Sequence, residues 1–252
     1  MHTLSSFPTG FVFIDKPAGI TSHDVVDRIR HLTNERCVGH AGTLDPFATG
    51  LLIIGVGRTA TKEFSKLVGL DKTYEATILL GVGSDTDDIT GKLTSSPENL
   101  TISEQTIRDT AKTMIGTTLQ IPPAYSAIKV GGKKLYEAAR EGKPIEVGSR
   151  PVTIHQFEMT SYKHSSIEKS NERIPVIEIK AIISCSSGTY IRAIARDLGK
   201  HLGTLGLLSQ LRRTTIGPFT IDEADKLPER GDVSITLKRH EAIEVLKRVA
   251  QP

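Results

Sequence analysis

The pattern of apolar and polar residues along the chain predicts its strands and helices. Alternation or short apolar runs predict strands at 11–15, 51–54, 72–82, 152–162, 174–184 and 219–221. Apolar residues three and four apart predict helices at 21–32, 59–67, 104–115, 191–202, 204–213 and 238–250. Thr21 and Thr101 each precede an acid by three residues, which is typical of a helix N-cap, and the polar segment 163–173 is expected to be a connection.

The number of predicted strands exceeds what a regular alternation with helices would give. We therefore predict an α+β fold with a mixed, largely antiparallel central sheet flanked by helices. The acidic segment 83–91 resembles a calcium loop, but an EF-hand that starts at Asp85 would need glycine at its sixth position and glutamate at its twelfth. Those positions hold Thr90 and Ser96, so a hairpin turn is predicted there.

Residues 39–50 lie between a predicted helix and a predicted strand, and they show neither the helical nor the strand pattern. It contains three glycines, two threonines and a proline. Glycine allows positive φ and close backbone approach, and Pro46 biases Asp45 towards extended backbone. The composition therefore predicts a loop that holds a fixed shape around one carboxylate. From the residues alone, Asp45 is either a structural turn residue or a catalytic group, and the structural interpretation is the stronger.

Composition and charge narrow the class of protein. The chain has 252 residues, of which 38% are hydrophobic and 24% are charged, as in a soluble globular protein with a substantial core. The net charge is only +3, but residues 129–150 hold six basic and three acidic side chains, and residues 192–213 hold five basic and one acidic. Such clusters indicate either a polyanionic partner such as RNA or DNA, or ordinary solvated helix faces.

Cysteine content and hydropathy indicate the cellular compartment. The two cysteines form no CxxC or metal-ligand spacing, which favours a reducing environment. The N-terminus shows no signal-peptide pattern, and the apolar run 51–56 is too short to span a bilayer. We therefore expect a cytoplasmic protein without membrane contact.

Six ordered sequence blocks, between about residues 10 and 225, resemble those of the TruB-type tRNA pseudouridine synthases. They are Asp-Lys-Pro-x-Gly-x-Thr-Ser-x-Asp from 15, Gly-His-x-Gly-x-Leu-Asp-Pro-x-Ala-x-Gly from 39, Lys-x-Tyr-Glu-Ala from 72, Asp-Thr-x-Asp-x-x-Gly from 85, Pro-Pro-x-Tyr-Ser-Ala-x-Lys from 122, and Thr-Tyr-Ile-Arg from 189 with Leu-Arg-Arg-Thr from 211. The block from 39 is highly specific. The others are weak singly, and their order carries the resemblance.

The resemblance implies a domain organisation and a reaction. A catalytic domain of the pseudouridine synthase fold is expected over 8–227, with a basic RNA-gripping insertion at 129–150. The remaining 228–252 are too few for the PUA-type RNA-binding domain of many bacterial members. The implied reaction converts uridine to pseudouridine at position 55 of the TΨC loop of tRNA, by base flipping, aspartate-dependent glycosidic cleavage and rejoining through carbon. It needs no cofactor or metal.

The resemblance also gives roles to single residues. Asp45 matches the catalytic aspartate, and Arg192 matches the arginine that pairs with this carboxylate and stabilises its charged form. Asp88 is a looser candidate for the same network. The expected substrate-binding residues are His40, Tyr74, Tyr190 and Leu211, with Tyr74 stacked on the flipped base. Possible contacts to RNA phosphates come from Lys129, Arg196 and Arg212. Without the resemblance, these side chains have ordinary explanations in the core or on the surface.

The expected partner is the T-arm of tRNA, bound by a monomer without an obligatory protein partner or guide RNA. Two alternatives remain open at the level of sequence. One is the catalytic subunit of a guide-RNA ribonucleoprotein, although the blocks from 72 and 85 look like the stand-alone bacterial type. The other is an RNA-folding chaperone that remodels tRNA without chemistry.

Overall fold

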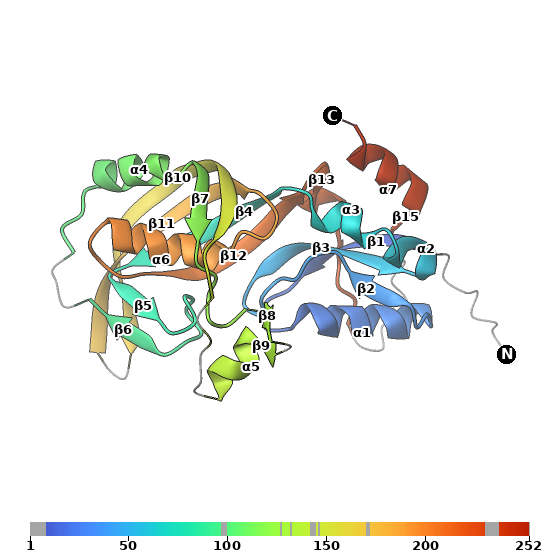
Figure 1. Cartoon of the computed structure of the whole chain (residues 1–252), viewed down its shortest axis with the longest axis horizontal. Coiled ribbons are helices and arrows are strands. Elements are labelled where there is room, and N and C mark those ends of the chain that lie inside the picture. The colour runs from blue at the N-terminus through green and yellow to red at the C-terminus, as the bar shows by residue number, and fades with distance from the viewer. Residues whose placement is uncertain are drawn as a thin grey trace. The chain divides into compact units, whose positions relative to one another are not determined.

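The computed structural model describes residues 9–96, 100–126, 128–131, 133–141, 145, 147–169, 172–229 and 237–251 (Figure 1). The chain divides into two compact units. Unit 1 comprises Met1–Tyr74 and Arg212–Pro252, and unit 2 comprises Glu75–Leu211. The division passes through two strands, β4 (Lys72–Leu80) and β12 (Gly206–Ile216), which therefore contribute residues to both units.

Unit 1 contains a mixed sheet built around two long strands. Its elements are β1 (Gly10–Lys16), α1 (Ser22–Thr33), β2 (Val38–His40), β3 (Thr49–Val56), α2 (Arg58–Thr61), α3 (Phe64–Val68), β13 (Phe219–Thr220), a 3-10 turn (Ile221–Glu223), β14 (Asp225–Lys226), β15 (Arg239–His240) and α7 (Ala242–Val249). Strand β1 is antiparallel to β3 and β15 and parallel to β14. Strand β3 is also antiparallel to β2 and parallel to the end of β12.

The strand period of two gives this sheet two apolar faces. Phe11, Phe13, Leu51 and Ile53 pack with residues of α2, α3 and α7. The alternate residues of the same two strands, from Val12 to Ile54, pack with the apolar stripe of α1. Figure 1 shows α1 along one side of β1 and β3, with α2, α3 and α7 along the other. Because both faces are covered, the strands are apolar at nearly every position.

Helix α1 begins as the sequence predicts. Thr21 is the N-cap, and its hydroxyl accepts a hydrogen bond from the backbone N–H of Asp24 at 3.0 Å. The Asp24 carboxylate accepts a hydrogen bond from the Thr21 N–H at 2.7 Å, which completes a capping box. This start is well defined, and it sets the position of Ser22, which bonds to the loop that carries Asp45.

Unit 2 is a larger antiparallel arrangement. Besides its parts of β4 and β12, it contains β5 (Val82–Ser84), β6 (Leu93–Ser95), α4 (Glu104–Thr113), β7 (Gly116–Gln120), β8 (Lys129–Val130), β9 (Lys133–Lys134), α5 (Leu135–Arg140), β10 (Arg150–Lys169), β11 (Glu172–Cys185) and α6 (Ile191–His201). Its strands follow the order β12-β4-β11-β10-β7. The β10–β11 ladder runs from the Ile154–Cys185 pair to the Lys169–Glu172 pair.

Several predictions of secondary structure were wrong. The polar segment 163–173 lies mostly in β10 and β11, because the two strands pair with each other through this segment and need little apolar surface there. The helix predicted at 204–213 is strand β12, which lies between β3 and β4 in the sheet. The helix predicted at 59–67 is two short helices, α2 and α3. The N-cap of α4 is Ser103 and not Thr101.

The α+β class and the mixed, largely antiparallel sheet are confirmed. The acidic segment 83–91 leads from β5 into its antiparallel partner β6, as predicted for a hairpin turn. The described part of the basic insertion 129–150 holds the β8–β9 hairpin and α5, and residues 132, 142–144 and 146 of it lie outside the described residues. No helix in the described ranges is long and apolar enough to cross a membrane.

Candidate active site

The loop that carries Asp45 comprises residues 41–48. It is shorter than the predicted segment 39–50, because the first two residues of that segment end β2 and the last two begin β3. Asp45 is half-buried. Its carbonyl oxygen accepts a hydrogen bond from the Ala48 N–H at 3.1 Å, which closes a tight turn around Pro46. The predicted turn is therefore present, with the carboxylate at its first position.

The residues on either side of Asp45 are held by the chain that leads into α1. The buried hydroxyl of Ser22 donates to the Leu44 carbonyl at 3.0 Å and accepts from the Leu44 N–H at 2.9 Å. The Gly19 N–H donates to the Pro46 carbonyl at 2.8 Å. With Leu44 and Pro46 both fixed to the same turn, the backbone of Asp45 has little freedom to move.

Lys16, at the end of β1, adds a cation to this loop. Its side chain is fully buried, and Nζ donates to the carbonyls of Pro17 and Ile20 at 2.8 Å each and to that of Pro46 at 3.3 Å. Burial lowers the pKa of Lys16 from 10.5 to about 8, although attraction to Asp45 partly opposes this shift. The ammonium therefore both binds the loop and lies within the electrostatic range of Asp45.

His40 and Tyr74 are the predicted substrate-binding residues in unit 1. Burial, with Arg213 and His23 as further causes, lowers the pKa of His40 from 6.5, so its imidazole is neutral at pH 7. His40 Nδ1 is buried without a hydrogen-bond partner among the described residues. Tyr74, in β4, is 8% exposed, and its phenol lies close enough to the Arg213 guanidinium to act on the pKa of that group.

Arg192 lies in unit 2 as the second residue of α6, and only 4% of it is exposed. Its Nη1 donates to the Thr86 carbonyl at 2.8 Å, and its Nη2 donates to the Tyr125 carbonyl at 3.0 Å. The distance from Nη1 to Asp88 Oδ2 is 3.6 Å, which is an ion pair. The predicted link between Asp88 and Arg192 is therefore present in the structure.

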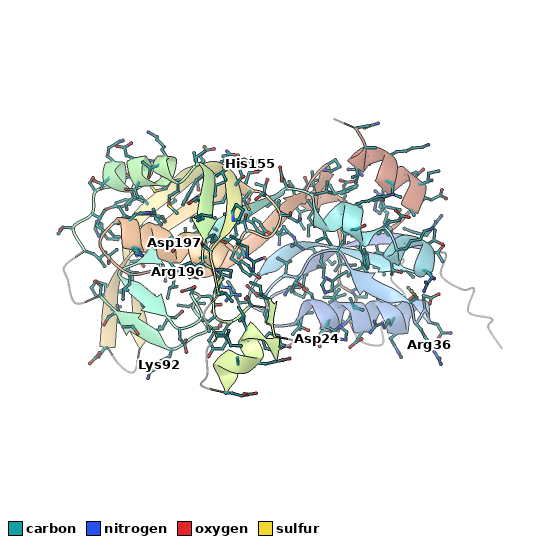
Figure 2. The ribbon with its side chains drawn as sticks, viewed as in Figure 1. Asp24, Arg36, Lys92, His155, Arg196 and Asp197 are labelled. Carbon is teal, nitrogen blue, oxygen red and sulfur yellow. The ribbon has the colours of Figure 1, made fainter. Side chains whose placement is uncertain are left out.

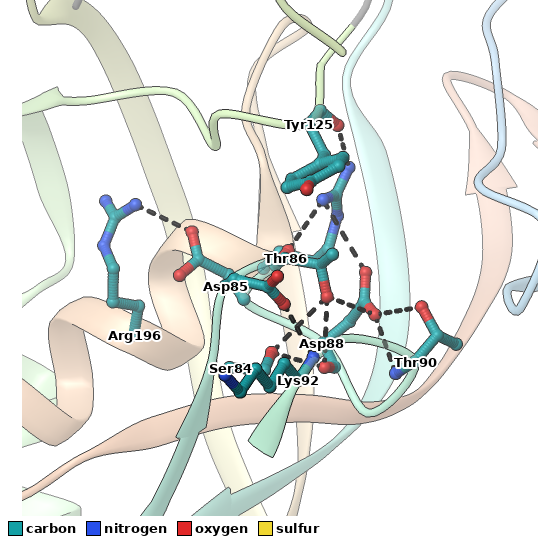
Figure 3. A network of polar contacts seen from close by, with 10 residues as sticks. Ser84, Asp85, Thr86, Asp88, Thr90, Lys92, Tyr125 and Arg196 are labelled. Carbon is teal, nitrogen blue, oxygen red and sulfur yellow. Dashed lines mark hydrogen bonds and ion pairs between the residues drawn. The ribbon is translucent and has the colours of Figure 1, made fainter. Parts of the chain in front are cut away.

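The Asp88 carboxylate is itself held on the turn between β5 and β6. Its Oδ1 accepts from the Thr86 hydroxyl at 2.9 Å, from the Thr90 N–H at 2.9 Å and from the Thr90 hydroxyl at 2.6 Å. Figure 3 shows Asp88 between Thr86 and Thr90 in this network. These bonds fix one carboxylate oxygen and leave Oδ2 facing Arg192. The turn thus acts as a rigid support for a buried cation.

Tyr190 and Leu211 are also in unit 2. The buried amide of Gln120 donates to the Tyr190 carbonyl at 3.1 Å and accepts from the Tyr190 N–H at 2.8 Å. The Arg150 guanidinium lies 5.8 Å from the centre of the Tyr190 ring, within the range of a cation–π contact. Leu211 is 8% exposed. Gln120 therefore fixes the start of α6, from which both Tyr190 and Arg192 project.

The arginines proposed as phosphate contacts already have carboxylate partners. Arg196 bonds to Asp87 at 2.8 Å and to Asp197 at 2.9 Å, and Figure 2 labels the latter pair on α6. Arg212 forms two bonds to the Asp15 carboxylate, at 3.0 and 2.8 Å. The side chain of Lys129 lies outside the described residues. An RNA phosphate at either arginine would share the guanidinium with these acids.

The predicted site residues thus form two groups, one in each unit. Asp45, His40 and Tyr74 belong to unit 1, and Asp88, Tyr190, Arg192 and Leu211 belong to unit 2. Ser22 and Gln120, which help to hold these groups, had no predicted role. The resemblance made Arg213, like Arg212, a contact to RNA phosphates, but Arg213 is buried and bonds to the loop backbone. Arg213 is two residues after Leu211, and side chains two apart share a face of a strand, but the sequence pattern predicted a helix in this segment.

Curated proteins of known name are similar to this chain over most of its length. The tRNA pseudouridine synthase B of Arthrobacter sp. (strain FB24) is 44% identical over 238 residues, which are 94% of this chain and 76% of the relative. The protein of the same name from Corynebacterium diphtheriae is 45% identical over 235 residues, 91% of this chain and 75% of the relative.

A solved structure and a family model extend the comparison. A chain in the crystal structure of a Cbf5-Nop10-Gar1 complex superposes with a TM-score of 0.60 at 29% identity, over 86% of this chain and 52% of the other. This chain therefore spans about half the length of that protein. The model described as TruB family pseudouridylate synthase (N terminal domain) matches residues 30–191. Together with the curated relatives, this match shows that the chain belongs to the TruB family of pseudouridylate synthases.

Proposed function

We propose that this member of the family isomerises a uridine of tRNA to pseudouridine, with Asp45 as the catalytic carboxylate. The observation that carries the proposal is the fixed loop 41–48. Its backbone is bound at Leu44 by Ser22 and at Pro46 by Gly19 and Lys16, directly beside Asp45. The curated relatives named tRNA pseudouridine synthase B supply the substrate class.

The chemistry rearranges one nucleoside without a net gain or loss of atoms. The bond between ribose C1′ and uracil N1 breaks, the base turns, and C1′ bonds to C5. The C5 proton leaves to solvent and N1 gains a proton. Before this, the uridine must leave its stack, which costs a few kcal/mol. We assign Tyr74 to stacking on the flipped base and Asp45 to attack on, or proton removal from, the nucleoside.

We assign the residues of unit 2 to supporting roles in the same reaction. Arg192 is the proposed partner of the catalytic carboxylate, and the Asp88 network holds its guanidinium in place. Tyr190 and Leu211 are the proposed lining of the uridine pocket, and His40 is a proposed contact to the opened RNA. The neutral state of His40 at pH 7 and its unpaired Nδ1 suit a hydrogen bond to a base or ribose.

The finer features of the activity are proposals of the same kind. They are a target at position 55 of the TΨC loop, recognition through the T-arm, a catalytic domain over 8–227, and action in the cytoplasm as a monomer without a guide RNA. The similarity to chains of H/ACA ribonucleoproteins, such as one bound to a substrate RNA, favours a guide-dependent enzyme as the second candidate.

The decisive experiment uses a tRNA transcript with tritium at C5 of its uridines. The purified protein should release tritium to water without any guide RNA, and Asp45→Asn should release none while it still binds tRNA. Asp27→Asn, an exposed aspartate on α1, is the matched control and should retain activity. A wild-type protein that needs a guide would support the second candidate. Full activity of Asp45→Asn would disprove the role of that residue.

A chaperone role without chemistry is tested by the same pair of variants. Asp45→Asn that still speeds the folding of unmodified tRNA, measured by native gel electrophoresis, would show that remodelling is separable from isomerisation. If wild-type protein gave tRNA refolding and no tritium release, the isomerase proposal would be wrong and the chaperone alternative would replace it.

A further inference from the structure

Arg213 is among the largest fully buried side chains of the chain, with 1% of its surface exposed. It lies on β12 within unit 1. A buried guanidinium is costly unless acceptors surround it, because it loses the solvation that water gives to a charge. Burial accordingly lowers the pKa of Arg213 below its ordinary value. A sequence that retains such a cation in its core needs a reason for it.

The guanidinium binds the backbone at the start of the loop 41–48 and in β3, the strand that follows the loop. Nη2 donates to the Gly42 carbonyl at 3.1 Å and Nη1 approaches the Thr43 carbonyl at 3.4 Å. Nε donates to the Leu51 carbonyl at 2.8 Å. One planar group therefore joins the residues that precede Asp45 to the strand that follows it. A guanidinium has five N–H donors in a fixed plane, so it can serve several acceptors at once.

The Tyr74 phenol lies near the same guanidinium, close enough to act on its pKa. The guanidinium therefore lies between the loop that carries Asp45 and the ring assigned to the flipped base. Tyr74 belongs to β4, whereas the other contacts of Arg213 lie in the loop and in β3. A change at Arg213 would release the loop and the ring together.

The backbone of Arg213 is as constrained as its side chain. Arg213 is the parallel partner of Gly50 in the β3–β12 ladder. A Cβ on Gly50 would lie 2.3 Å from the Arg213 carbonyl oxygen, and φ of Gly50 is +105°, so this close approach needs glycine. The strand pairing thus fixes the Arg213 backbone beside Gly50, close to the end of the loop.

We propose that Arg213 is a positioning residue for the isomerisation, which fixes the Asp45 loop and the Tyr74 ring relative to each other. This inference rests on the proposed function. Arg213 touches no reacting atom in this assignment, and its effect passes through Gly42, Thr43 and Tyr74. Lysine at 213 would keep the charge but offer a single ammonium, which cannot reproduce the planar set of bonds.

The test compares Arg213→Lys with Arg248→Lys. Arg248, also in unit 1, bonds to Glu223 and to the Pro218 carbonyl, and it has no part in the site. In single-turnover reactions at saturating protein, Arg213→Lys should be slower by about 10- to 100-fold, as expected when reacting groups are displaced by about 1 Å. Its affinity for tRNA should stay within about twofold of wild type. Arg248→Lys should match wild type in both.

A second measurement does not depend on activity. Protein labelled with fluorotyrosine gives ¹⁹F resonances for its five tyrosines, and Tyr74→Phe identifies the one from Tyr74. Arg213→Lys should move that resonance, and Arg248→Lys should not. An unmoved resonance, or a wild-type rate in Arg213→Lys, would overturn the inference. If wild-type protein released no tritium, the proposed function would fail instead, and the fluorine shift would still report on the contact.

Folding of the variants is the remaining control. Thermal unfolding should show Arg213→Lys folded at the assay temperature. If it is not, Arg213→Ala with added ethylguanidinium replaces it, because the small cation can occupy the vacated space. A rate that rises with ethylguanidinium but not with ethylammonium supports positioning by a planar donor. Equal effects of the two ions would contradict it.

Discussion

Asp88 and Arg192 form a buried ion pair, and further hydrogen bonds hold both side chains in place. The guanidinium also bonds to two carbonyls, and the carboxylate accepts three further hydrogen bonds. Such a pair is weak evidence for stability in itself, because desolvation opposes the attraction. The pair holds the cation in one place. Removal of one partner is destabilising, because it leaves an uncompensated buried charge.

We therefore expect Asp88→Asn to destabilise the protein by about 3 kcal/mol, because a buried cation loses its facing anion. The amide oxygen could still accept the bonds from Thr86 and Thr90, so the loss of stability reports on the missing charge. Asp85→Asn, an exposed residue of the same turn that accepts from the Lys92 N–H, should cost much less. Urea unfolding of both variants measures the difference, and equal losses would contradict the proposed role of the pair.

Lys16 predicts an unusual dependence of stability on pH. Its pKa is about 8 in the folded protein and 10.5 in its ordinary state. Between these values the unfolded chain binds more protons than the folded one, so the contribution of Lys16 to the free energy of unfolding rises with pH. Relative to Lys16→Met, wild type should gain up to about 2 kcal/mol from pH 8 to pH 10.

The measurement is urea unfolding of both proteins across that window. Every other titrating group is common to the two chains, so the change in their difference belongs to Lys16. The absolute stability of Lys16→Met does not enter, because the substitution also removes three hydrogen bonds. Parallel curves for the two proteins would show that the buried ammonium does not titrate near pH 8.

The residues that could be predicted from sequence were those inside a specific motif. Asp45 and His40 stand in one compact block, so the resemblance proposed them as candidates. Ser22, Arg213 and Gln120 act through hydrogen bonds to main-chain groups 22 to 171 residues away. Those bonds depend on where the backbone lies in space, and local periodicity holds no information about it.

At the level of elements, the errors came from competition between local pattern and strand pairing. The leucines of 204–213 fit a helix and a strand equally well. Pairing with β3 and β4 on either side of β12 favours the strand. The strands β10 and β11 extend through polar sequence because they pair with each other. By contrast, the strands 11–15 and 51–54 and helix α1 were predictable, since both faces of their sheet are buried and periodicity alone determined them.

Helix α4 gives a direct test of an element boundary. The sequence pattern favours Thr101 as the N-cap, whereas the Ser103 hydroxyl accepts from the Thr106 N–H at 3.1 Å in the structure. Removal of a cap hydroxyl leaves a backbone N–H unpaired and costs about 1 kcal/mol. Ser103→Ala should therefore lower the free energy of unfolding by about that amount. Thr101→Ala should leave it within experimental error, and the reverse result would move the start of α4.

At the scale of the whole molecule, fewer of the basic residues on α6 are available to a partner than the sequence pattern suggested. Arg192, Arg196 and Lys200 recur every four residues along α6, and an exposed stripe was one interpretation of them. Arg192 is in fact buried, and Arg196 is neutralised by Asp87 and Asp197. Lys200 is exposed, and no carboxylate among the described residues pairs with it. The charge of this stripe available to RNA is thus concentrated at its last residue.

This distribution predicts how binding to tRNA should respond to salt. Each phosphate that a lysine neutralises releases condensed cations, which contributes about 0.7 to 0.9 to the slope of log affinity against log salt. Lys200→Gln should reduce the slope by about that amount and weaken binding at low salt. Lys112→Gln, in which the lost ammonium already pairs with Asp109 at 3.2 Å, should leave the slope unchanged. Filter binding across a salt series measures both, and equal slopes for wild type and Lys200→Gln would show that α6 does not contact the RNA backbone through this residue.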